Sequence, residues 1–203
     1  MGQLIIHMER DVPARGMNKS ALPDINKLKE HLFDRDYELI RSLFPISINT
    51  KTPKMIYPGS GCDILVPLLF VKHLFPNITS LELQLIDLFP QEVLVKTILD
   101  DLGIPFSAEN EKILFYWHGV LVNLQCTVAN AFSFNFAQFD IYFERAFRIM
   151  KDQDPEFEKK IVAKLKSGGI LISDSGFSNI SLQRITVPKE LSSYGEMVVG
   201  VKK

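Results

Sequence analysis

The sequence predicts an α/β fold in which the strands of a mostly parallel sheet alternate with helices. Two observations predict it. Short apolar runs alternate along the chain with segments whose apolar residues recur at helical spacing. In addition, the apolar run at 54–57 leads directly into Gly59 and Gly61, a tight turn suited to joining a strand to a helix. At 203 residues the chain is long enough for one sizeable core.

The predicted helices are marked at their ends by capping and helix-breaking residues. Asp24 can cap the first helix, and Pro45 follows its end. Gly103 is expected to stop the third helix, and the pair Gly168-Gly169 to terminate the fourth. The predicted helices span residues 24–43, 68–74, 90–102 and 154–167.

The predicted strands are apolar runs bounded by turn residues. His118-Gly119 lies between two of them, which indicates a hairpin whose second arm is the third sheet strand and whose first arm is an added edge strand. The last two runs are expected to close an antiparallel edge. The predicted strands span 54–57, 83–87, 113–117, 120–126, 139–143, 170–173, 185–187 and 197–201.

Composition and charge favour an ordinary globular protein. The chain is 46% hydrophobic and 23% charged, and its formal net charge of −1 gives no general reason to expect nucleic acid or an anionic membrane as partner. No signal peptide and no run of roughly 20 apolar residues for a membrane span is evident. Cys62 and Cys126 form no CxxC pair, so neither a metal site nor a disulfide framework is expected. The expected location is the reduced environment of the cytoplasm.

Three features carry the chemistry. Gly59 and Gly61 let the backbone approach a ligand closely, and the helix that follows offers free N–H groups. Asp87 ends the second predicted strand, where a carboxylate can accept hydrogen bonds from both ribose hydroxyls of a nucleoside. The third feature is the segment 164–174, a helix end, two glycines and an apolar strand. A plain tight turn and a helix cap at Asp87 are the structural alternatives.

These features, in this order and approximate spacing, resemble the class I (Rossmann-like) S-adenosylmethionine-dependent methyltransferases. The resemblance covers roughly residue 54 to the C-terminus. It is greatest to a branch with a Tyr-Pro-Gly-Ser-Gly-x-Asp loop, here 57–63, and an Asp-Ile-Tyr-Phe-Glu strand, here 140–144. It implies a three-layer Rossmann-like methyltransferase sandwich, with S-adenosylmethionine as cofactor.

The resemblance also implies roles for individual residues. The loop glycines and Ser60 would line the methionine part of the cofactor, Asp87 would hold its ribose, and the segment after the third strand would meet the adenine. An Asn there can accept the bond that an acidic residue usually accepts. The candidate cofactor-binding residues are Tyr57, Gly59, Ser60, Gly61, Asp63, Asp87, Leu88, Asn130 and Ala131.

The loop departs from the family pattern at two positions. Tyr57 replaces the usual acid, and Asp63 stands where the family has its last glycine. Asp63 is expected either to bind the amino group of the cofactor or to cap the helix near Pro67. Glu144 and Arg145, near the carboxyl end of the fourth parallel strand, are the catalytic candidates.

The function predicted first is therefore methyl transfer to an acceptor that the sequence does not identify. The altered loop motivates an alternative, a catalytically inactive methyltransferase-like protein that binds a ligand or a partner. An NAD(P)-dependent oxidoreductase is a third possibility, but Ile64 stands where G-x-G-x-x-G needs its last glycine. Residues 1–50 are expected to form a helical extension or lid on a domain of residues 51–203, and no oligomeric state is indicated.

Overall fold

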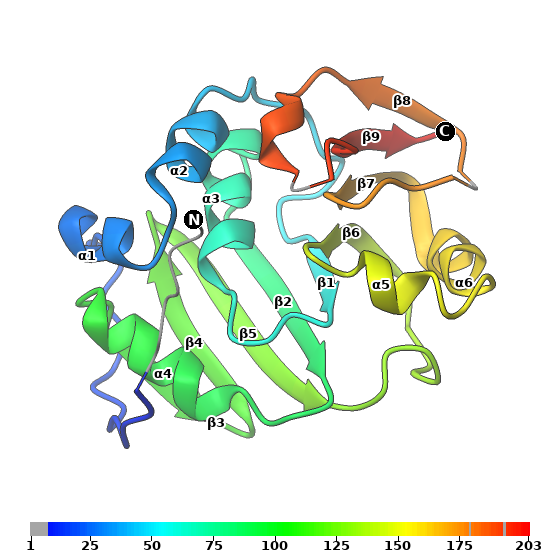
Figure 1. Cartoon of the computed structure of the whole chain (residues 1–203). Coiled ribbons are helices and arrows are strands. Elements are labelled where there is room, and N and C mark those ends of the chain that lie inside the picture. Colours follow the sequence, from blue (N-terminus) through cyan, green and yellow to red (C-terminus); the bar gives the residue numbers. More distant parts are fainter. Residues whose placement is uncertain (1–7, 179, 193) are drawn as a thin grey trace.

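The computed structural model describes residues 8–178, 180–192 and 194–203, so the first seven residues of the predicted extension lie outside it. A nine-stranded sheet of order β3-β4-β5-β2-β1-β6-β7-β9-β8 forms the centre (Figure 1). Strands β5, β2, β1, β6 and β7 are parallel. The antiparallel strands β4 and β3 extend one edge, and β9 and β8 the other. The strands are β1 (Lys54–Pro58), β2 (Ser80–Asp87), β3 (Phe106–Glu109), β4 (Lys112–Trp117), β5 (Val120–Val128), β6 (Phe139–Glu144), β7 (Leu165–Ser173), β8 (Leu182–Ile185) and β9 (Val198–Lys202).

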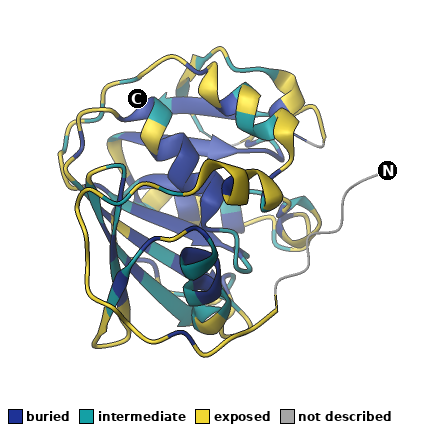
Figure 2. Cartoon of the chain, turned by 90° about the vertical axis from the view of Figure 1, so that its left-hand side faces the viewer, coloured by how far each residue is buried: buried dark blue, intermediate teal, exposed yellow. Residues whose placement is uncertain are grey.

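Two hydrophobic cores make the molecule three-layered, because successive side chains of a strand point to opposite faces. In β1, Met55 and Tyr57 belong to the core shared with α1 to α4, whereas Ile56 belongs to the core shared with α6. Figure 2 shows the strands largely buried between these layers. The helices are α1 (Ile25–Glu30), α2 (Asp34–Arg41), α3 (Leu65–Leu74), α4 (Glu92–Asp101), α5 (Arg148–Lys151), α6 (Phe157–Lys164) and the 3₁₀ helix η1 (Lys189–Leu191).

The predicted α/β class is confirmed, including the parallel centre, the antiparallel C-terminal edge and the added hairpin. The hairpin through His118-Gly119 pairs β4 with β5 as expected. The structure adds β3 beyond it, joined to β4 through Asn110 and Glu111, which both have positive φ. The sequence analysis missed β3 because four residues with one buried apolar side chain, Phe106, carry almost no pattern.

The helix predicted over 24–43 is wrong as a single element. It is interrupted after α1, and Phe33 takes an extended conformation (ψ 130°) before α2 begins. Asp24 caps α1 as predicted, through its carboxylate and the N–H groups of Asn26 and Lys27. The interruption turns His31, Leu32 and Phe33 toward a cavity, which periodicity alone does not reveal.

The predicted end of the last helix at Gly168-Gly169 is also wrong. Helix α6 ends at Lys164, and β7 begins at Leu165 and passes through both glycines. The pairing register of β7 with β6 shifts between Phe139 and Ile141, so the glycines lie at a bulge. A Cβ atom on Gly169 would lie 2.7 Å from the Leu165 side chain, which explains the glycine there.

The N-terminal segment that precedes α1 lies against α4 and β3. The backbone N–H of Arg10 donates to Thr97 Oγ1 (3.1 Å), and that of Arg15 to the Phe106 carbonyl (3.0 Å). The Arg10 guanidinium also pairs with Asp101 (2.6 Å) at the C-terminal end of α4. The division at residue 50 and the lid role stay predictions. Among the helices of the described residues, none has the length and apolar character needed to cross a membrane.

Candidate functional site

The glycine loop joins β1 to α3 and is held by the end of β2. Gly59 (φ +62°) donates its N–H to the Ile86 carbonyl at 2.8 Å. Gly61 (φ +51°) donates to Asp87 Oδ2 at 2.9 Å, and the Phe89 N–H donates to Asp87 Oδ1 at 3.2 Å. Since each carboxylate oxygen can accept two hydrogen bonds, Asp87 fixes the loop and keeps acceptor capacity for a ligand.

Gly59 is in tight contact with an aromatic side chain. A Cβ atom at this position would lie 2.4 Å from the ring of Phe147, whereas one on Gly61 would meet nothing within 4 Å. The Phe147 ring is 3% exposed and lies against Phe132 and Phe157, with ring centroids 5.8 and 5.5 Å away. Glycine at position 59 is therefore required both by the backbone conformation and by the close approach of this ring.

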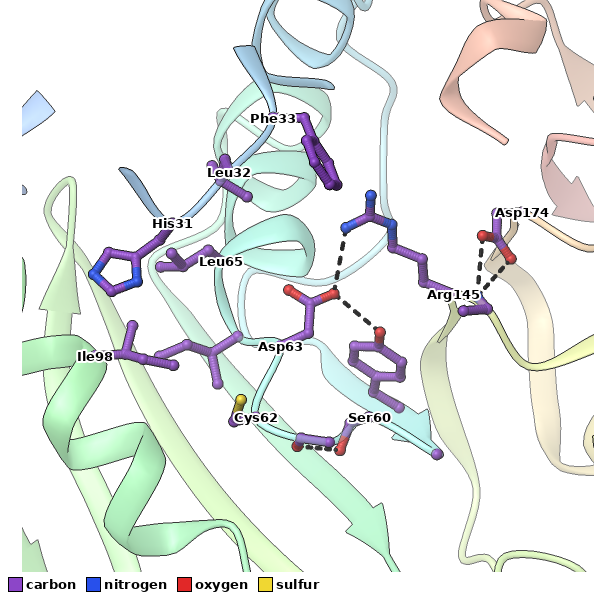
Figure 3. A pocket seen from close by; sticks show the side chains of 15 residues that line it. His31, Leu32, Phe33, Ser60, Cys62, Asp63, Leu65, Ile98, Arg145 and Asp174 are labelled. Carbon is purple, nitrogen blue, oxygen red and sulfur yellow. Dashed lines mark hydrogen bonds and ion pairs between the residues drawn. The ribbon is translucent and has the colours of Figure 1, made fainter. Parts of the chain in front are cut away.

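Two cavities meet at Gly59, on the edge of the sheet where the parallel strands have their carboxyl ends. We call them the Asp63 cavity, about 430 Å³, and the Asn130 cavity, about 260 Å³. The first lies between the loop 59–65, the link from α1 to α2, and the ends of β6 and β7 (Figure 3). The second is lined by Gly59, Ile86, Asp87, Leu88, Phe89, Ala129, Asn130, Ala131, Phe132, Phe147 and Met150.

Charged side chains converge at one end of the Asp63 cavity. Arg145 forms an ion pair with Asp36 of α2 and lies 3.8 Å from Asp63. Asp63 also accepts hydrogen bonds from the Tyr57 hydroxyl (3.1 Å) and from the Val66 N–H (3.3 Å). Burial raises the pKa of the Asp63 carboxyl, and the nearby Arg145 guanidinium opposes this. Asp63 thus accepts an N–H group from the first turn of α3, whose N-cap residue is Ile64, and at the same time lines the cavity.

The Asn130 cavity is mostly apolar. Leu88 and Phe89 form an exposed part of its rim, 63% and 69% accessible. The Asn130 side-chain oxygen accepts the Phe132 N–H at 3.0 Å, so this carbonyl has one lone pair left for a ligand. Phe132 is stacked on Phe147, which gives the cavity a flat aromatic wall.

The two catalytic candidates have different surroundings. Arg145 lines the Asp63 cavity, but Glu144 lines neither of the two cavities. Glu144 is 1% exposed and accepts hydrogen bonds from Tyr142 (2.6 Å) and Lys151 (2.7 Å). Two serines, Ser173 and Ser175, donate to the same carboxylate. Glu144 therefore holds β6, β7 and α5 together, and we assign it no contact with a ligand.

Three elements of this site were missed in the sequence. Asp174 follows β7 and accepts the N–H of Ala146 on both carboxylate oxygens at 3.0 Å. Ala146 itself has φ +54°, an uncommon value for a non-glycine residue. The strand-end rule that selected Asp87 could have selected Asp174 as well. Asp36 and the link with Phe33 have no sequence signal.

The described part of the chain contains no group of three or more His, Cys, Asp or Glu side chains arranged to hold a metal ion.

Comparison with known proteins gives structural likeness without sequence likeness. No protein-family model and no curated protein matches the sequence. A Methanococcus maripaludis protein classed as an S-adenosylmethionine-dependent methyltransferase is 12% identical, with a TM-score of 0.49 over 88% of this chain and 90% of that one. An O-methyltransferase family 2 protein of Planctomyces limnophilus, in complex with apigenin, is 13% identical, with a TM-score of 0.43 over 68% of this chain.

Human N-acetylserotonin methyltransferase, in complex with S-adenosylmethionine, is 14% identical, with a TM-score of 0.41 over 72% of this chain. The chain covers 37% of the Planctomyces protein and 35% of the human protein, little more than a third of each. At such identities and with TM-scores below 0.5, no activity, substrate or partner is carried over from these proteins.

Proposed function

We propose that this protein binds S-adenosylmethionine and transfers its methyl group to an acceptor molecule. One observation carries the proposal: the Asp63 and Asn130 cavities meet at Gly59, at the carboxyl edge of a parallel sheet. A ligand made of a nucleoside and an amino acid has the same two-part shape. The antiparallel β9–β8 edge agrees with the sheet that the methyltransferase resemblance implies.

The proposed cofactor contacts follow from the two cavities. The adenosine half fits the Asn130 cavity, where Asp87 can accept the ribose hydroxyls, Asn130 the adenine amine, and Leu88 and Ala131 pack against the ring. The methionine half fits the Asp63 cavity, over Gly59, Ser60 and Gly61. The Asp63 carboxylate there, held by Tyr57, complements a positively charged amino group. The bound cofactor would supply an electrophilic methyl group on sulfur.

Calorimetric titration tests this proposal. S-adenosylmethionine and S-adenosylhomocysteine are expected to bind and NADPH is not; binding of NADPH alone would show the proposal to be wrong and favour an oxidoreductase. Asp87→Ala is expected to weaken binding by about tenfold or more, because a hydrogen bond to a charged group contributes about 1.5–3 kcal/mol. Glu82→Ala, which removes an exposed acid from the other end of β2, is the matched control. Unchanged affinity in Asp87→Ala would remove the ribose assignment.

A methyltransferase-like binding protein without transfer activity is the second candidate. It is favoured by the ion pair of Arg145 with Asp36 and by the hydrogen bond of Asp63 to the first turn of α3. Saturable cofactor binding without turnover, over a panel of amine, hydroxyl and carboxylate acceptors, would support it.

A further inference from the structure

The charged end of the Asp63 cavity has more negative than positive groups. The carboxylates of Asp36 and Asp63 both pair with the guanidinium of Arg145, and Asp174 lies close enough for a Coulombic interaction with the same guanidinium. The nearby Lys151 adds no free positive charge, because its ammonium group is paired with Glu144 at 2.7 Å. With these groups ionised, the cavity end has two unbalanced negative charges. The amino group of the proposed cofactor would balance the charge of Asp63, and the remaining negative charge favours a positively charged acceptor over an anion.

Asp174 is the most buried of these carboxylates, and no side chain among the described residues donates a hydrogen bond to its carboxylate. The residue is 4% exposed, and among the described residues its only hydrogen-bond donor is the Ala146 N–H, shared by both oxygens. An ionised carboxylate has about four acceptor positions, and a buried one is costly unless they are filled. Burial raises the pKa of the Asp174 carboxyl, and the Ala146 N–H only partly opposes this. A ligand that donates hydrogen bonds would fill the remaining acceptor positions.

Much of the rest of the Asp63 cavity is lined by apolar side chains, although His31, Ser60 and Cys62 line it as well. Leu32 and Phe33 cover it from the link between α1 and α2, and Leu65 and Ile98 line it from α3 and α4. Figure 3 shows the Phe33 ring near Arg145 and the aliphatic side chains on the opposite side of Asp63. A ligand with an apolar body and a cationic group fits both parts of this cavity.

We propose that Asp174 binds the amino group of the methyl acceptor, so that the protein is an amine N-methyltransferase with an apolar or aromatic substrate. This inference rests on the proposed function, because it identifies the acceptor of that reaction.

The step balances as follows. An ammonium nitrogen has no free electron pair, so the acceptor R–NH₃⁺ first gives one proton to the Asp174 carboxylate and becomes R–NH₂. The lone electron pair of the amine nitrogen then forms the N–C bond with the methyl carbon of S-adenosylmethionine, while the C–S bond breaks and its electron pair stays on sulfur. The products are R–NH₂⁺–CH₃ and the neutral thioether S-adenosylhomocysteine. Asp174 afterwards releases its proton to water at the open side of the cavity.

Three probes with the same phenyl-ethyl body test the proposal: phenethylamine, 2-phenylethanol and 3-phenylpropionate. Binding is measured by calorimetry and ligand-observed NMR, with and without S-adenosylhomocysteine. The probe concentration is raised to about 10 mM, so that a weak complex with a dissociation constant of about 1 mM is still detected. Phenethylamine is expected to bind about tenfold more tightly than the alcohol, the carboxylate most weakly, and only the amine to be methylated. Equal or tighter binding of the alcohol, or no amine binding, would overturn the proposal.

Asp174→Asn is expected to abolish the preference for the amine, because the amide can still accept the Ala146 N–H but has no charge. Asp152→Asn removes an exposed acid outside both cavities and is expected to leave it unchanged. Amine binding that is unaffected by Asp174→Asn contradicts the proposal; if that variant does not fold, the selectivity of the wild type decides. Amine binding that depends on Asp174 without any binding of S-adenosylhomocysteine would refute methyl transfer but keep the amine site.

Discussion

Replacement of Gly59 by alanine tests the close contact between the glycine loop and the Phe147 ring, at the point where the two cavities meet. The substituted alanine has to adopt φ near +62°, and its Cβ atom would lie 2.4 Å from the Phe147 ring. The left-handed conformation costs an alanine about 1–2 kcal/mol. Overpacking against a buried ring adds about 1–3 kcal/mol, because Phe147 must move against Phe132 and Phe157. Gly59→Ala is therefore expected to lower the free energy of unfolding by about 2–5 kcal/mol.

Gly61→Ala is the matched control, since it has a similar φ of +51° and open space around its Cβ position. It is expected to cost only the backbone term, about 1–2 kcal/mol. Urea unfolding can be followed by the fluorescence of Trp117, the single tryptophan. Its side chain is fully buried, and its indole N–H donates a hydrogen bond to the Leu68 carbonyl at 3.0 Å. The excess cost of Gly59→Ala should disappear in a Phe147→Ala background. Equal costs for both glycines, or an excess that persists without the ring, would refute the steric explanation.

Two further predictions concern buried carboxylates. Burial raises the pKa of the Asp174 carboxyl in the native state above its unfolded value of about 3.9, so the native state binds the carboxyl proton more tightly. The free energy of unfolding therefore falls as pH rises from the unfolded pKa through the native pKa. Asp174→Asn should then melt at a higher temperature than the wild type near neutral pH and at the same temperature toward about pH 4; a difference that grows on acidification would contradict this. Glu144→Ala should cost about 3–5 kcal/mol in urea unfolding, because it leaves the buried Lys151 without its main partner. Glu144→Ala with Lys151→Met should recover much of that loss, and a double variant no more stable than the single one would argue against a charge effect.

The sequence predicted those parts of the fold in which local chemistry and tertiary structure agree. The parallel strands are continuous apolar runs, and the loop at Gly59 follows one of them directly. The interruption after α1 could not be predicted, because the leucines continue at helical spacing across it. The bulge in β7 depends on the partner strand β6, which the two glycines do not specify by themselves.

The same reasoning separates the site residues that were found from those that were missed. Asp87 and Asn130 follow strands in a parallel sheet, so topology alone gathers them at one edge. Asp36 reaches Arg145 across 109 positions of sequence, and no spacing rule connects them. Glu144 satisfied the strand-end rule but lines neither cavity, because neighbouring side chains of one strand alternate between its two faces.

The central place of β1 has a consequence for how the chain is made. β1 pairs with β2 along one side, but its other partner, β6, follows some 80 residues later, with Met55 opposite Ile141. During synthesis the first half of the sheet therefore has an unpaired apolar edge until residues 139–144 leave the ribosome, and such edges invite association with other chains. The candidate site shares this delay, because the glycine loop after β1 is made early, whereas Arg145 and Asp174, which follow β6 and β7, are made late.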